Sequence, residues 1–151
     1  MLTLAIVDAN DRASKDERFI DATVSVTGQW LEWEIARAGI TLVDPSEADV
    51  ILLVFAGQVD YRRRCTYYLK RNQIEPDARK RAGKPLVITG GPVDAVPRLA
   101  LSIADIVAIG EAYTFIRDIL EIIWLDGSAA DLLTYARDYE HAIEREQFEG
   151  L

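Results

Sequence analysis

The residues of this chain that could bind a ligand stand in loops directly after short apolar segments. Two of these loops contain glycine, Thr89–Pro92 and Gly110–Tyr113, and each follows an apolar run. Glycine lets a backbone come close to a ligand, and the carboxyl end of a parallel strand is where α/β proteins bind flat or phosphorylated ligands. We therefore interpret the stretch from Pro85 to Tyr113 as the edge of a cofactor site.

Two earlier loops, Asp8–Asp11 and Ala56–Gln58, also follow apolar runs and would face the same edge. The candidate cofactor-binding residues are Asp8, Asn10, Gly57, Thr89, Gly90, Gly91, Gly110, Glu111 and Tyr113. Glu111 has two interpretations: it accepts hydrogen bonds from a ligand, or its charge stabilises the start of the following helix. Asp8 also has two interpretations: it contacts a ligand, or it is a turn residue of the loop.

Residues able to catalyse a reaction or to hold a metal are scarce in this sequence. The chain has one cysteine, Cys65, and one histidine, His141. A single cysteine excludes an internal disulfide and cannot by itself hold zinc or an iron–sulfur cluster. A catalytic pair of the two would have to join a central helix to the far C-terminus. We therefore predict no catalytic or metal-binding residue, and a chain that is not catalytic on its own.

The composition is that of one ordinary globular unit. Of the 151 residues, 50% are hydrophobic and 28% are charged, which excludes a disordered chain. No apolar run is long enough to span a bilayer, and the first residues lack a basic leader. We expect a cytoplasmic protein without a membrane partner.

Apolar runs alternate with segments of helical periodicity, and this alternation predicts an α/β protein. Strands are predicted at Leu2–Val7, Ile40–Val43, Val50–Phe55, Leu86–Ile88 and Ile106–Ile109. Helices are predicted at Gly28–Ala38, Asp60–Asn72, Asp77–Ala82, around Val96–Ile103, at Tyr113–Leu125 and from Ala129 to about Glu146. The expected fold is a three-layer, Rossmann-like (flavodoxin-like) doubly wound sheet of five parallel strands in the order 2-1-3-4-5. In the first helix, Trp30 and Trp33 either cover the sheet or form a stacking platform.

Several functions of such sheets are excluded by residue type. A phosphate-accepting receiver domain needs an aspartate after the third strand and a lysine after the fifth, where this chain has Ala56-Gly57 and Gly110-Glu111. The first loop, Asp8-Ala9-Asn10, has no glycine for a dinucleotide fingerprint. A flavodoxin-type phosphate loop needs several hydroxyl groups there, and only Ser14 offers one.

The order of the landmarks resembles that of one known family. The landmarks are Asp44, Ala48-Asp49-Val50, Thr89-Gly90-Gly91-Pro92 and the run from Ala104-Asp105 to Gly110-Glu111. They resemble the N-terminal cobalamin-binding domain of radical S-adenosylmethionine enzymes, in which the fourth strand ends in a GGP step and the fifth in an AD-apolar-GEGE-T run. The resemblance covers roughly residues 39–123.

The resemblance implies a cobalamin whose flat corrin ring lies across the strand ends, with Gly90 and Gly91 on one side and Gly110 and Glu111 on another. The second GE of the family is replaced here by Ala112-Tyr113. The histidine motif with which some cobalamin proteins ligate cobalt is absent from the first loop. The chain is thus expected either to hold a corrinoid or to be a degenerate relative that does not bind one.

The resemblance also implies a partner. The catalytic barrel of these enzymes carries a CxxxCxxC cluster motif, which a chain with only Cys65 lacks, so no iron–sulfur cluster is expected here. We expect a radical S-adenosylmethionine barrel domain as a partner in cis or in trans. Residues 1–127 would be the cobalamin-binding-like domain, and residues 128–151 a C-terminal helix packed on it that could connect to such a barrel.

An alternative function rests on charge. The chain has a net charge of −8, which argues against broad nucleic-acid binding. Residues 61–84 nevertheless contain nine bases against two acids: Arg62, Arg63, Arg64, Lys70, Arg71, Arg79, Lys80, Arg81 and Lys84 against Glu75 and Asp77. This segment is either a solvated helix face or the dock of a non-catalytic recognition module. As a dock it would bind nucleic acid or an acidic partner through Arg62, Arg63, Arg64, Lys70 and Arg71.

Overall fold

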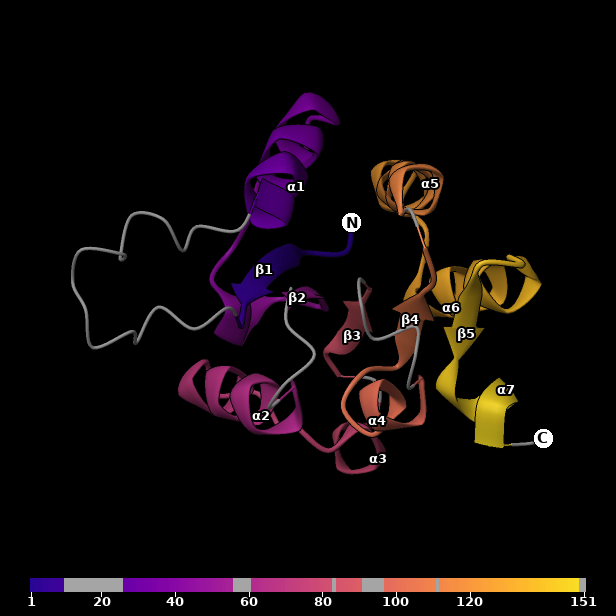
Figure 1. The fold of residues 1–151 in the computed structure, drawn as a ribbon. Coiled ribbons are helices and arrows are strands. Elements are labelled where there is room, and N and C mark those ends of the chain that lie inside the picture. The colour runs from indigo at the N-terminus through magenta and orange to yellow at the C-terminus, as the bar shows by residue number, and fades with distance from the viewer. Residues whose placement is uncertain (10–25, 56–60, 83, 91–96, 111, 150–151) are drawn as a thin grey trace.

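Apolar segments rich in Val, Ile and Leu pair side by side at the centre of the protein, as expected for strands buried on both faces. The computed structural model describes residues 1–9, 26–55, 61–82, 84–90, 97–110 and 112–149. Within these ranges the chain folds into a five-stranded sheet with helices on both faces (Figure 1). The strands are β1 (Leu4–Asp8), β2 (Val50–Val54), β3 (Leu86–Thr89), β4 (Ile106–Ala108) and β5 (Ala142–Glu144). The helices are α1 (Val26–Arg37), α2 (Tyr61–Arg71), α3 (Ala78–Arg81), α4 (Pro97–Leu101), α5 (Tyr113–Trp124), α6 (Ala129–Asp138) and α7 (Arg145–Glu149), with a 3-10 helix η3 (Pro45–Glu47) before β2.

The α/β class and the mostly parallel sheet agree with the prediction, and the arrangement is consistent with a Rossmann-like fold. The predicted order 2-1-3-4-5 of five parallel strands is wrong, because the predicted second strand is not part of the sheet and an unpredicted strand, β5, pairs antiparallel with β4. The other four predicted strands became β1, β2, β3 and β4, which lie side by side in the predicted order. The segment predicted as the second strand, Ile40–Val43, makes only an isolated parallel bridge from Leu42 to Leu4 of β1. It flanks the sheet without becoming a strand of it.

The other difference lies near the C-terminus, where the sequence predicts one helix from Ala129 to about Glu146. The start is confirmed, because Ser128 and Asp131 exchange the two hydrogen bonds of a capping box, at 2.8 and 3.2 Å. Helix α6, however, ends at Asp138, and the chain then turns back to form β5 on the edge of β4. This pairing satisfies backbone groups of β4 that a longer helix would leave without strand partners.

Successive residues of a strand point to opposite faces, so the sheet separates two apolar cores. One core lies beneath α1, α5 and α6 and includes Leu52 of β2 and Ile119 of α5. The other lies beneath α2 and α4 and includes Leu53 of β2 and Leu69 of α2. Figure 1 shows these two helical layers above and below the sheet. Among the helices in the described ranges, none combines the length and the apolar character needed to cross a membrane.

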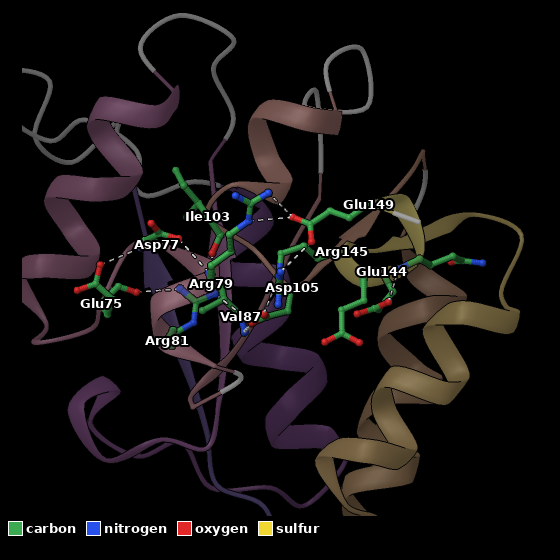
Figure 2. Close-up of polar contacts among 12 residues, drawn as sticks. Glu75, Asp77, Arg79, Arg81, Val87, Ile103, Asp105, Glu144, Arg145 and Glu149 are labelled. Atoms are coloured by element: carbon green, nitrogen blue, oxygen red, sulfur yellow. Dashed lines mark hydrogen bonds and ion pairs between the residues drawn. The ribbon is translucent and has the colours of Figure 1, made fainter. Parts of the chain in front are cut away.

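Arg81, the last residue of α3, is buried although it belongs to the basic segment. Its guanidinium donates hydrogen bonds to the carbonyl oxygens of Glu75, Pro85 and Ile103 at 2.6–2.8 Å, and to Oδ2 of Asp105 at 3.0 Å (Figure 2). The Arg81 side chain is 0% exposed and that of Asp105 is 5% exposed. A charge that is buried so completely persists only when it is paired and hydrogen-bonded. Arg81 is therefore a structural residue and not part of a basic surface.

Asp105 connects this ion pair to the sheet. The residue directly precedes β4, and its Oδ2 also accepts the backbone N–H of Val87 in β3 at 2.9 Å. Its carbonyl oxygen accepts the N–H of Arg145, the residue that follows β5, at 2.8 Å. The Arg81–Asp105 pair thus joins the starts of β3 and β4 to the end of β5.

Replacing Asp105 by Ala is expected to lower the free energy of unfolding by about 3–5 kcal/mol, because the buried guanidinium loses its counter-charge. Urea unfolding followed by circular dichroism measures the change. Glu146→Ala is the matched control, since it breaks the exposed Arg137–Glu146 pair away from Asp105 and should cost at most about 1 kcal/mol. Equal losses in the two variants would contradict a structural role of the buried pair.

Candidate ligand-binding site

A cavity of about 170 Å³ lies at the carboxyl ends of β2, β3 and β4. Parallel strands bring their carboxyl ends to one edge of a sheet, which is why the cavity forms there. It is lined by Trp30 and Leu31 of α1, by Ile88 and Gly90 at the end of β3, and by Ile116 of α5. Helices α1 and α5 lie on the same face of the sheet (Figure 1). The space is therefore mostly apolar, and it is closed on one side by the strands and on the other by these helices.

Two predicted site residues, Thr89 and Gly90, line this cavity. The Thr89 side chain is engaged within the sheet, because its hydroxyl donates to the carbonyl oxygen of Leu53 at 2.9 Å. At Gly90 an added Cβ would lie 3.3 Å from the carbonyl oxygen and 3.4 Å from the Cβ of Ala108. This glycine therefore allows close packing of the end of β3 against β4, a structural reason that does not require a ligand.

Gly110 and Tyr113 lie beyond β4, before and at the start of α5. Gly110 has φ +74°, a conformation that favours glycine, and no described atom lies within 4 Å of where its Cβ would be. Gly110 therefore has a backbone conformation that favours glycine and open space on the side where a Cβ would lie. The ring of Tyr113 is half exposed and meets Trp30 edge to face, with ring centroids 4.7 Å apart. Tyr113 thus connects α5 to α1 beside the cavity.

The remaining predicted residues divide into one that the structure describes and four that it does not. Asp8 is half-buried at the end of β1, and the next residue, Ala9, continues the pairing by donating its N–H to the carbonyl oxygen of Val54 at 2.7 Å. Asn10, Gly57, Gly91 and Glu111 lie outside the described residues. Both interpretations of Glu111 therefore stay predictions, and the structure brings Thr89 and Gly90 to the cavity with Tyr113 beside it.

The two tryptophans of α1 have different surroundings. Trp30 is half-buried against the core and lines the cavity, so it covers the sheet and presents an aromatic surface at the site. Trp33 is 57% exposed and has the guanidinium of Arg37 over its ring, 5.2 Å from the centroid. Covering the sheet is therefore wrong for Trp33. The spacing of the two tryptophans in the sequence does not indicate which of them is buried.

The sequence does not predict the parts of the site that depend on tertiary packing. Thr27, Ala112 and Ile116 also line the cavity. Ala112 lies in the loop that the sequence predicts at this edge, whereas Thr27 and Ile116 come from α1 and α5 and are not predicted there. His141 is also brought to this edge, because β5 runs antiparallel and the His141 carbonyl oxygen accepts the N–H of Ile109 at 2.7 Å. Its imidazole is exposed and lies against the ring of Tyr139. No local sequence pattern signals this position.

The described residues offer little reactive chemistry. Among them, no three His, Cys, Asp or Glu side chains come together to hold a metal ion. Cys65 is buried in the core beneath α2, and burial raises the pKa of its thiol to about 12. The neighbouring Tyr61 is also buried, and burial raises the pKa of its hydroxyl. Both groups stay protonated and uncharged at neutral pH.

Comparisons with protein-family models, with curated proteins and with solved structures give no match.

The substitution Gly110→Ala is expected to lower the free energy of unfolding by about 1 kcal/mol, because an L side chain is strained at this positive φ. Gly110→Asn is the matched control, since asparagine tolerates the left-handed region and should cost less. Urea unfolding compares the two variants with the wild type. A larger loss for Asn than for Ala would mean that space, and not the backbone angle, decides this position.

Cys65 is expected to react with a thiol reagent such as dithionitrobenzoate only in urea, because the folded thiol is buried and protonated. The unfolded chain loses this proton near the ordinary pKa of 9.0, whereas the folded chain keeps it until about 12. Stability linked to Cys65 is therefore complete below pH 9 and falls as the pH rises toward 12. Comparing the free energy of unfolding of the wild type and of Cys65→Ala across this pH range measures the contribution of Cys65. Fast labelling of the folded protein would contradict the burial of the thiol.

Proposed function

We propose that this chain is the cobalamin-binding-like domain of a radical S-adenosylmethionine protein and that it holds a corrinoid at the carboxyl edge of the sheet. One observation carries the proposal: the apolar cavity at the ends of β2, β3 and β4, between α1 and α5. It lies where doubly wound α/β sheets bind cofactors. The motif Thr89-Gly90-Gly91-Pro92, on which the family resemblance rests, begins at its wall.

The size of the cavity limits how such a ligand fits. A corrin is a macrocycle of four five-membered rings and is far larger than 170 Å³. An apolar cavity of about 150 Å³ admits a benzene ring. The cavity therefore suits a single ring-sized apolar group of the ligand, and the macrocycle belongs outside it, over the strand ends. The open position at Gly110 supports this assignment, because no described atom lies within 4 Å of where its Cβ would be.

The residues near the cavity suit holding a ligand better than transforming it. Trp30 and Tyr113 offer aromatic faces, and Ile88 and Ile116 offer apolar walls. His141 supplies an imidazole at the same edge, and imidazole is a common metal ligand. When bound, the corrinoid would supply the organometallic chemistry, and this domain would position it. The catalytic steps then belong to a radical S-adenosylmethionine barrel in cis or in trans.

Titrating the purified chain with hydroxocobalamin is expected to shift the visible spectrum and to leave pigment on the protein after gel filtration. Ala112→Leu places a larger side chain at the cavity wall and should weaken binding about tenfold, since overpacking a filled site is unfavourable. Ala130→Leu, at an exposed position on α6 outside the cavity, is the matched control and should bind like the wild type. No spectral change and no retained pigment at high concentration would reject the corrinoid.

A further inference from the structure

A second cavity, a groove of about 810 Å³, lies on the other face of the sheet. Its walls come from α2, from the segment around α3, from α4 and from α7. Arg62, Thr66 and Lys70 of α2 line it, and their spacing of four residues places them on one side of that helix. Arg98 and Ser102 line it from the region of α4. The groove therefore has cationic side chains on two opposite elements.

Three of these cations have no side-chain partner among the described residues. Within the described residues, the side chains of Arg62, Lys70 and Arg98 make neither a hydrogen bond nor an ion pair. Two of the three acids that line the groove, Glu75 and Asp77, accept hydrogen bonds from backbone N–H groups. Glu75 accepts the N–H of Asp77 at 3.1 Å, and Asp77 caps α3 by accepting the N–H of Arg79 at 2.9 Å. The basic segment predicted from the sequence thus contributes Arg62 and Lys70 to a concave surface.

One end of the groove already holds a carboxylate. Oε1 of Glu149, from α7, accepts hydrogen bonds from Nε and Nη2 of Arg79 at 3.1 and 2.9 Å (Figure 2). The neighbouring Phe148 also lines the groove and is partly buried against the core beneath α2 and α4. The chain's own C-terminal helix therefore shows which chemistry fits here, an acid beside an aromatic ring.

We infer that this groove binds an acidic segment of a partner protein, whose carboxylates contact Arg62, Lys70 and Arg98. Charge complementarity supports this occupant, and the Phe148–Glu149 contact shows that an acid with an apolar neighbour is accepted at this surface. The chain as a whole carries −8, so a long nucleic acid would be repelled by the surface around the groove. A short acidic segment meets mainly the groove itself, because charges beyond a Debye length of about 8 Å are screened.

The test uses the full chain and a labelled peptide that repeats Glu-Gln-Phe-Glu, the sequence of residues 146–149. Fluorescence anisotropy is expected to show binding that weakens with salt. The double variant Arg62→Glu with Lys70→Glu should weaken binding about tenfold, because two attractions become repulsions. The variant Arg71→Glu with Lys80→Glu makes the same change of charge at exposed positions outside the groove, and should bind like the wild type.

A peptide that repeats Gln-Gln-Phe-Gln and a single-stranded oligonucleotide complete the design. Several results would overturn the proposal: no binding of the acidic peptide, equal binding of the neutral peptide, or equal loss in the two double variants. Tighter binding of the oligonucleotide that is lost only in the groove variant would assign the groove to nucleic acid instead. Because groove and cavity lie on opposite faces of the sheet, both variants should still bind hydroxocobalamin like the wild type.

Discussion

The buried ion pair between Arg81 and Asp105 holds together a part of the sheet that has few other contacts of its own. Strands β3 and β4 share only two paired positions, Ile88 with Ile106 and Thr89 with Val107. The ion pair fixes the starts of both strands, and the next position along them places Gly90 beside Ala108. Losing one partner of such a pair costs about 3–5 kcal/mol, a large share of a stability of about 5–15 kcal/mol. The geometry at the carboxyl ends of these strands thus depends on charges at their opposite end.

The sequence predicts the elements whose cause is local and fails where pairing between distant segments decides. The segments that became β1, β2, β3 and β4 are apolar runs, and burial on both faces explains that composition. Ile40–Val43 has the same composition but makes only a single bridge to β1. The residues of β5 continue the helical spacing of α6, and only the free edge of β4 explains why they form a strand. Propensity is a weak guide when tertiary pairing competes with it.

The candidate site shows the same limit at the level of single residues. Gly90 and Gly110 both lie at the predicted edge, but the sequence does not show why each position is a glycine. Gly90 is explained by close packing on Ala108, whereas Gly110 is explained by its positive φ and has open space beside it. Of the two, only Gly110 has open space where its Cβ would be. The sequence does not distinguish Trp30 from Trp33, and only the structure shows that Trp30 lines the cavity whereas Trp33 is exposed.

The basic residues of the segment 61–84 also include residues that stabilise the fold and residues that line the surface of the groove. In the sequence Arg81 is one of nine basic residues in this segment, but in the structure it is buried and paired with Asp105. Arg79 is paired with Glu149. Arg62 and Lys70 lie on the side of α2 that lines the groove, together with Arg98 of α4. The cations of the groove and the apolar cavity lie on opposite faces of the sheet, so the two ligands that we propose would not compete for one surface.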